Sequence, residues 1–132
     1  MINLEIVTPA KMVVSESVDS VTVPTRKGEI GILANHAPLI STLRSGVLSY
    51  RKDGETEEMV ISGGFVEVSM DKVSVLADIA ERSAEVDVEK ARAEKGDAEK
   101  ILGAWKGSEE EFEVELERLE KAQARLQLAA KN

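Results

Sequence analysis

Residues 28–46, GEIGILANHAPLISTLRSG, form the least generic stretch of the chain. The stretch holds the only histidine, His36, and one of the three prolines, Pro38. A short apolar run, Ile30–Leu33, leads into the corner at residues 35–38. Because Pro38 lacks an N–H and disfavours a helical conformation at the residue before it, the chain must turn or extend there. Residue chemistry alone therefore favours a strand, a turn and a second strand within a small β-domain.

Alternating apolar residues on both sides of this stretch predict further strands. The alternation is clearest over residues 2–7 and 73–77. Asp53-Gly54 is the strongest hairpin signal, because both residue types tolerate positive φ. Gly63-Gly64 lies between two apolar runs, where a close backbone approach or a bulge is expected. No GK[ST] sequence follows it, so we do not interpret it as a phosphate loop.

The composition changes after Ala84, where Ala, Glu, Lys, Leu and Arg replace Val, Thr and Ser. We expect a first helix over about residues 87–104, with Asp87 as its N-cap. Glycines should end this helix, with Trp105 folded over the turn. Its expected apolar face consists of Val88, Ala91, Ala98, Ile101, Leu102 and Trp105.

A second helix is expected to start after Ser108, because Ser108 and Glu111 have the spacing of a capping box. Its expected length is about 22 residues. Two helices joined by a short turn form an antiparallel hairpin. The sequence therefore predicts an α+β fold with two domains: a β-sandwich of short antiparallel strands over residues 1–84, then a two-helix hairpin over residues 85–132. The expected stripe of the second helix is Phe112, Leu116, Leu119, Ala122, Leu126 and Ala130.

The hairpin should be only marginally stable. Gly96 lies in the middle of the first helix, at a cost of about 1 kcal/mol relative to alanine. Alanine supplies much of both apolar faces, so each helical turn buries little area. Two interpretations remain open: a hairpin that docks and undocks, or one packed permanently on the sandwich.

Composition excludes several classes of function. The chain has 132 residues, a net charge of −8 and no cysteine. The negative charge argues against nucleic-acid binding, which needs a clustered basic face. The lack of cysteine excludes disulfides and thiolate metal sites. No apolar run is long enough to span a bilayer, so we expect a soluble protein that reaches a membrane only through partners.

Catalytic chemistry finds little support. With His36 as the only histidine, neither a histidine metal pair nor a Ser-His-Asp arrangement is available. We therefore expect a non-catalytic protein without a metal site. One charged constellation has two interpretations: a nucleotide site with cations on phosphates, or a network of salt bridges between the helices. Its members are Asp87, Lys90, Arg92, Lys121 and Arg125.

The order of these pieces resembles the epsilon subunit of bacterial and chloroplast F-type ATP synthases. The resemblance extends over the whole chain, from sandwich to hairpin. It is carried by GEIGILANHAPLISTLRSG (28–46), ISGGFVEV (61–68), KVSVLADIAER (72–82) and, more loosely, VDVEKA (86–91).

The resemblance implies a rotor-stalk protein whose sandwich binds the gamma subunit and the ring of c subunits, coupling proton-driven rotation to ATP synthesis. Carried over by position, Glu29 and His36, with Gly31 and Ile32, would lie on the surface that faces the c-ring loops. The protein would be peripheral, on the cytoplasmic side of the cell inner membrane.

The resemblance also implies that an extended hairpin reaches the alpha/beta catalytic head and blocks ATP hydrolysis, an action that would depend on Arg118, Lys121 and Arg125. Some family members bind ATP in the folded hairpin, at the pattern I/L-D-x-x-R-A. Here lysine replaces that arginine, and it keeps the charge but loses the bidentate fork. ATP is therefore expected only as a weak regulatory ligand. The residues carried over are Asp87, Lys90, Ala91, Arg92, Lys121 and Arg125.

Two rival functions remain on the residues alone. One is a stand-alone β-sandwich that binds a small ligand, and the other is an adaptor that dimerises through its helices.

Overall fold

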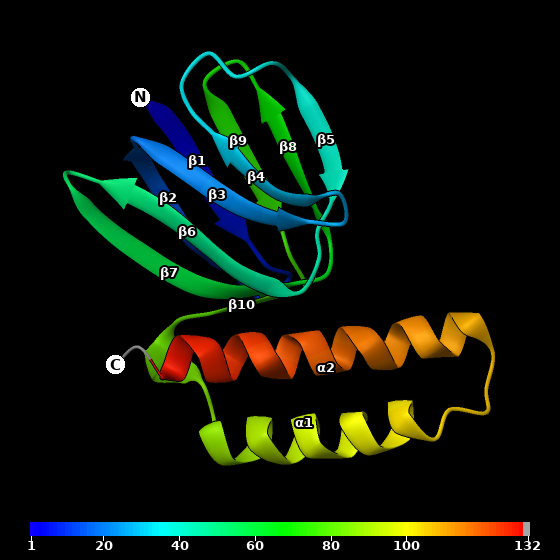
Figure 1. Cartoon of the computed structure of the whole chain (residues 1–132). Coiled ribbons are helices and arrows are strands. Elements are labelled where there is room, and N and C mark those ends of the chain that lie inside the picture. The colour runs from blue at the N-terminus through cyan, green and yellow to red at the C-terminus, as the bar shows by residue number, and fades with distance from the viewer. Residues whose placement is uncertain (131–132) are drawn as a thin grey trace.

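The computed structural model describes residues 1–130 of the chain; the last two residues of the predicted hairpin domain lie outside this range. Two β-sheets pack face to face, and a helical hairpin lies across one end of them (Figure 1). In chain order the elements are β1 (Ile2–Val7), β2 (Met12–Val18), β3 (Ser20–Thr25), β4 (Gly28–Ile32), β5 (Leu39–Thr42), β6 (Gly46–Lys52), β7 (Glu55–Ser62), β8 (Phe65–Ser69), β9 (Lys72–Leu76), β10 (Ile79–Glu81), η1 (Ser83–Glu85), α1 (Val88–Gly103) and α2 (Glu109–Ala129).

The predicted α+β class, a sandwich followed by a hairpin of helices, is confirmed. The first sheet has the order β2-β1-β9-β8-β5 and the second β10-β7-β6-β3-β4. Strand pairing is antiparallel except between β1 and β9, which run parallel. The prediction of antiparallel strands missed this pair because β1 and β9 are joined by a long excursion through the second sheet, and such a crossover permits parallel pairing.

The core consists of the inward residues of both sheets. Leu4 and Ile6 on β1 are completely buried, as the alternation predicts. Asp53 and Gly54 adopt φ values of 52° and 81° and join β6 to β7, which confirms the predicted hairpin. The core is therefore aliphatic, with Tyr50 as its one aromatic member.

Gly63-Gly64 carries the chain from the second sheet to the first. Their φ values are 74° and 87°, in the region that favours glycine. A Cβ built on Gly64 would overlap the carbonyl oxygen of Leu76 on β9. The predicted close approach of two backbones is confirmed.

The hairpin begins and turns as predicted. The Asp87 carboxylate accepts the Lys90 N–H at 3.1 Å, and the Ser108 hydroxyl accepts the Glu111 N–H at 3.2 Å. Trp105 closes the turn: its indole N–H donates to the Ser108 carbonyl at 3.2 Å, and its ring meets Phe112 edge-on at 5.6 Å. Both caps and the folded-over tryptophan are confirmed.

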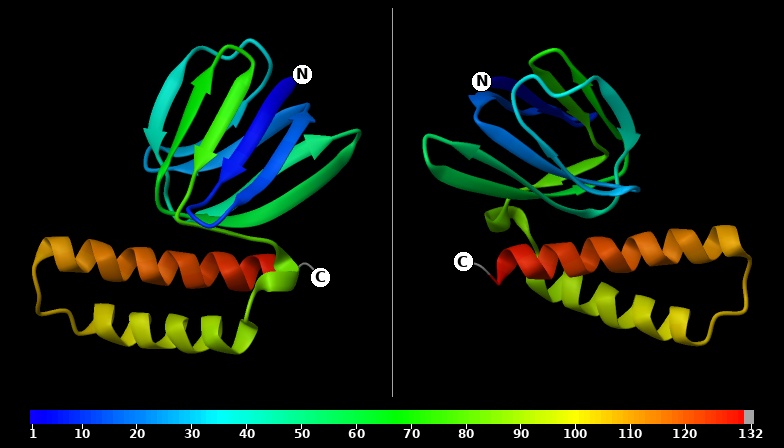
Figure 2. Two further views of the ribbon diagram at one scale, coloured as in Figure 1. Left: turned by 180° about the vertical axis from the view of Figure 1, so that it is seen from behind. Right: turned by 45° about the horizontal axis from the view of Figure 1, so that its top comes forward.

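The predicted apolar stripe of α2 is incomplete. Ala122 is buried as expected, but Ala124 and Leu128, outside that stripe, are buried too and pack on Val60 and Val47 of the second sheet. The reason is that α2 lies between the sandwich and α1 in all the views (Figure 2), so the helix has two contact faces. A single stripe of apolar residues at helical spacing identifies only one of these two faces.

Candidate functional site

The end of the sandwich farthest from the hairpin is formed by the β4–β5 corner and the β8–β9 turn (Figure 1). The Asn35 N–H donates to the Asp71 carboxylate at 3.4 Å and so joins the two segments. His36 Nδ1 lies 2.7 Å from the Ala37 carbonyl oxygen, which fixes the ring against its own turn. Leu33 and Met70 are 66% and 84% exposed. This end therefore combines a partly exposed imidazole with unusually exposed apolar side chains.

Not all residues predicted to face the c-ring lie on the surface, because side chains alternate between the two faces of β4. Glu29 and Gly31 are exposed and His36 is partly exposed, but Ile32 is only 1% exposed and belongs to the core. The prediction that Ile32 lies on the surface is wrong. Successive side chains of a strand point to opposite faces, so Ile32 points inward, as its neighbour Ile30 does. The Ile-x-Ile spacing in the sequence carried this signal.

Gly31 is not required by the fold. A Cβ built on it meets no atom within 4 Å, and its φ is not positive. Because β4 is an edge strand of its sheet, the missing side chain leaves open space beside exposed backbone. The site suits close approach by another chain.

A second exposed surface, which the sequence analysis missed, crosses the outer face of the first sheet. Met12, Val7, Leu76 and Phe65 are consecutive partners on β2, β1, β9 and β8, and we call them the outer apolar row. Ile40, on the neighbouring β5, is 71% exposed. A contiguous apolar strip on a sheet face is typical of a protein-binding surface. The sequence contained a signal for this surface, since these strands carry apolar residues at positions that face outward as well as at positions that face the core.

The predicted nucleotide residues meet only in part. A cavity of about 160 Å³ is lined by Asp87, Lys90, Ala91 and Arg125 together with Glu81 and Glu85. Arg92 and Lys121 are not among its lining residues. Arg92 instead pairs with Glu89 at 3.1 Å on the surface of α1.

Arg125 already has carboxylate partners. Its Nε and Nη2 donate to the two oxygens of Glu81 at 2.7 and 3.0 Å, and Glu94 lies 3.8 Å away. The cavity lining has three carboxylates and two cations, and its volume is below the roughly 300 Å³ of ordinary ligand pockets. This arrangement favours the salt-bridge interpretation over a phosphate site.

Arg118, expected to act in the extended hairpin, is paired within the docked one. It donates to Asp97 and Glu115, each at 2.8 Å. The hydrogen bonds to Asp97 and then to Glu115 raise the pKa of Arg118 above its ordinary value. The pair with Asp97 joins α2 to α1.

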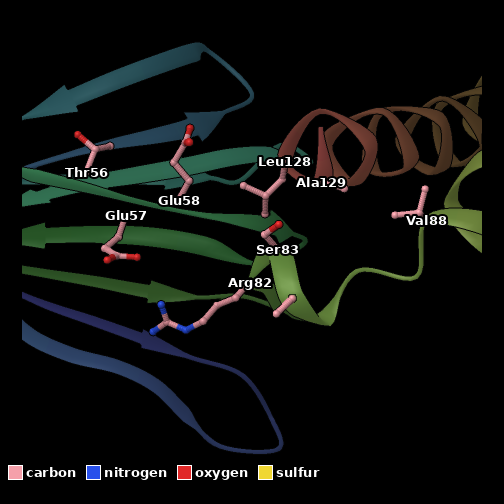
Figure 3. A pocket seen from close by; sticks show the side chains of 9 residues that line it. Thr56, Glu57, Glu58, Arg82, Ser83, Val88, Leu128 and Ala129 are labelled. Atoms are coloured by element: carbon pink, nitrogen blue, oxygen red, sulfur yellow. The ribbon is translucent and has the colours of Figure 1, made fainter. Parts of the chain in front are cut away.

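A further cavity, of about 610 Å³, is an open space between β7, η1, the start of α1 and the end of α2 (Figure 3). Glu57 and Arg82 point toward its sandwich side, and Leu128 and Val88 lie toward its helical side. Within residues 1–130 no group of three or more His, Asp or Glu side chains is arranged to hold a metal ion. Over the same range, no helix combines the length and apolarity needed to cross a membrane.

The fold defines a class of proteins in which a sandwich of two five-stranded sheets is followed by a helical hairpin, and this member has two exposed surfaces suited to contact with other chains. A sequence profile described as "ATP synthase, Delta/Epsilon chain, beta-sandwich domain" matches residues 1–83. The chain belongs to the epsilon-chain family of ATP synthases, and it is a non-catalytic subunit of that type.

Individual relatives agree over most of the chain. The ATP synthase epsilon chain of Geotalea uraniireducens (strain Rf4) is 42% identical over 98% of this chain and 94% of its own length. That of Trichlorobacter lovleyi is 44% identical over 97% and 93%. Among solved structures, a chain of the Euglena gracilis mitochondrial ATP synthase, in an assembly of OSCP, F1 and c-ring, matches with a TM-score of 0.80 and 27% identity. It covers 99% of this chain and 81% of that one.

Proposed function

We propose that the chain is a rotor-stalk subunit whose sandwich binds the gamma subunit and the c-subunit ring, and so couples proton-driven rotation to ATP synthesis. The observation that carries this proposal is the likeness, over nearly the whole chain, to a chain of an assembly containing F1 and a c-ring. The subunit would be peripheral, on the cytoplasmic side of the inner membrane, and held there by its partners.

Each exposed surface has a proposed partner. The surface that runs along β4 from Glu29 and Gly31 to the corner with His36 would meet the polar loops of the c-ring, because it offers a carboxylate, an imidazole and open backbone. Glu29 lies at the start of β4, in a cavity shared with Gln127 of α2, and His36 lies beyond the opposite end of that strand. The outer apolar row would be covered by gamma, since removing apolar surface from water gains about 25 cal/mol per Å² before the entropic costs of association are subtracted.

The two domains have different proposed roles. Residues 1–84 would anchor the subunit, and residues 85–132 would regulate it. Extended, the hairpin would place Arg118, Lys121 and Arg125 against the alpha/beta head and slow ATP hydrolysis. Because Arg125 is already held by Glu81, ATP would be a weak ligand of the docked form at most.

Reconstitution tests the proposal. The full chain is added to a cognate synthase stripped of its epsilon subunit, and binding, proton-driven ATP synthesis and ATP hydrolysis are measured. We expect binding that restores coupling. Met12→Asp with Ile40→Asp should weaken binding at least about tenfold, because each exposed apolar position would carry a charge into the contact with gamma.

Val114→Asp is the matched control, since Val114 is 70% exposed on α2, away from the outer apolar row. It should bind like the unchanged chain, and all variants should melt alike. Failure of the full chain to bind would refute the rotor-stalk proposal. Unchanged binding of the Met12/Ile40 variant would refute only the proposal that gamma covers the outer apolar row.

A further inference from the structure

The contact between α2 and the sandwich is mainly polar. Its buried apolar members are Val60, Ala124 and Leu128, with Val47 partly buried beside them. One leucine and one alanine are a small apolar contribution for a helix of 21 residues. The remaining contacts between α2 and the sandwich, which are polar, therefore determine the position of the hairpin.

Two glutamates one turn apart on α2 supply these further contacts. The Glu117 carboxylate accepts a hydrogen bond from the Ser45 hydroxyl at 2.5 Å and lies 3.4 Å from an Arg26 nitrogen. Glu120 pairs with Arg44. Because residues three apart lie on one side of a helix, both carboxylates face the same rim of the sandwich.

The receiving groups on the sandwich are held in place by the fold. The Ser45 hydroxyl is 2.8 Å from the Ser62 hydroxyl, and the two serines are only 6% and 8% exposed. The backbone N–H groups of Arg26 and Arg44 donate to Thr42 and Pro24 at 3.0 and 3.1 Å. A carboxylate from α2 therefore meets a nearly buried hydroxyl and two arginines whose backbones are fixed, while the arginine side chains themselves are 53% and 51% exposed.

The charges at this contact are partly shielded from water. The side chains of Glu117 and Glu120 are 25% and 16% exposed. The hydrogen bond to Glu120, together with its charge, raises the pKa of Arg44 above its ordinary value. At the far end of the contact, Arg125 and Glu81 form a further pair, 15% and 24% exposed, with the charges reversed.

We propose that the hairpin is held on the sandwich by an ionic clamp, in which Glu117 and Glu120 bind Arg26, Arg44 and Ser45, and that ionic strength rather than nucleotide sets the docked fraction. The regulatory meaning of the clamp rests on the proposed function above. High salt weakens such pairs, since at 1 M the Debye length is about 3 Å, comparable with the 3.4 Å between Glu117 and Arg26, and the arginine side chains are open to water. A nucleotide in the small cavity would have to displace Glu81 from Arg125 before its phosphates could contact that arginine.

The isolated full chain allows a direct test. The sequence contains no cysteine, so Ser69→Cys on the sandwich and Lys106→Cys in the hairpin turn can carry a pair of spin labels. Both positions are exposed and lie outside the clamp. Electron–electron distance measurements then report the docked fraction at low and high NaCl, and with ATP at matched ionic strength.

We expect a single docked distance at low salt, a growing undocked population at high salt, and no response to ATP. Glu117→Gln with Glu120→Gln should lower the docked-to-undocked ratio about five- to tenfold at low salt, as expected for the loss of two partly exposed ion pairs. The matched control is Glu99→Gln with Glu110→Gln, which removes the same charge at exposed helical positions and should remain docked. Arg44→Glu should undock the hairpin, and adding Glu120→Arg should restore docking.

Docking that is insensitive to both salt and the Glu117/Glu120 substitutions would overturn the clamp. So would equal undocking of the control, or a shift with ATP at constant ionic strength. Because this assay needs no synthase, its result is separate from the rotor-stalk proposal. If the clamp variant undocks but leaves ATP hydrolysis by the reconstituted synthase unchanged, the clamp stands and the regulatory role fails.

Discussion

The sandwich and the hairpin are stabilised in different ways. The sandwich encloses a continuous aliphatic core in which Leu4, Leu48, Ile61 and their neighbours are completely buried. The two helices bury mainly alanines against each other, and only Leu128 adds a large side chain at the sandwich. The difference indicates that the sandwich is a stable platform, while the hairpin depends on its contacts with that platform.

The largest predicted effect contrasts two leucines. Leu48→Ala empties a completely buried site in β6 and should lower the free energy of unfolding of the sandwich by about 2–5 kcal/mol. Leu128→Ala, at a site 3% exposed, should instead weaken the docking of α2 and leave sandwich unfolding nearly unchanged. Denaturant titrations should follow Trp105 fluorescence for the hairpin and Tyr50 near-ultraviolet dichroism for the sandwich, since each is the only residue of its type.

In the Leu128 variant the Trp105 transition should move to lower denaturant while the Tyr50 transition stays in place. If the two transitions move together in both variants, the protein unfolds as one unit. The contrast between platform and appendage would then be wrong.

The next prediction tests how the platform is connected internally. Gly64→Ala should lower the free energy of unfolding by about 3 kcal/mol, because a side chain is strained at φ 87° and would collide with the Leu76 carbonyl. Gly54→Ala is the matched control: its φ is 81°, but no atom lies within 4 Å of a built Cβ, so only about 1 kcal/mol is expected. Equal losses in the two variants would show that backbone strain alone, and not the close approach of the two sheets, determines the effect.

Local chemistry made much of the fold predictable. Alternation placed Leu4 and Ile6 in the core, Asp53-Gly54 specified a hairpin, and Asp87 and Ser108 capped the helices. These signals act within a few residues, and tertiary packing did not override them.

Contacts between distant segments were harder to predict from the sequence. The clamp joins Arg26 to Glu117, which are 91 residues apart. The sequence around either residue gives no indication of its partner. Ala124 and Leu128 were missed because a helix between two layers has a second face. The predicted nucleotide residues separated for a geometric reason: at about 100° per residue, Arg92 points away from the face that carries Lys90 and Ala91 toward Arg125.

The smallest predicted effect stabilises the appendage alone. Gly96 lies exposed in the middle of α1, and a Cβ built on it meets no atom within 4 Å. Gly96→Ala should therefore stabilise the hairpin by about 1 kcal/mol through helix propensity. It should make the ellipticity at 222 nm more negative and move the Trp105 transition to higher denaturant, while the Tyr50 transition is unchanged. Gly103→Ala, at the last residue of α1, also has free space but should gain less, because a helix end benefits less from helix propensity than its interior. A matching gain in sandwich stability from Gly96→Ala would mean that the hairpin contributes to the stability of the platform, and that the dependence between the two regions runs both ways.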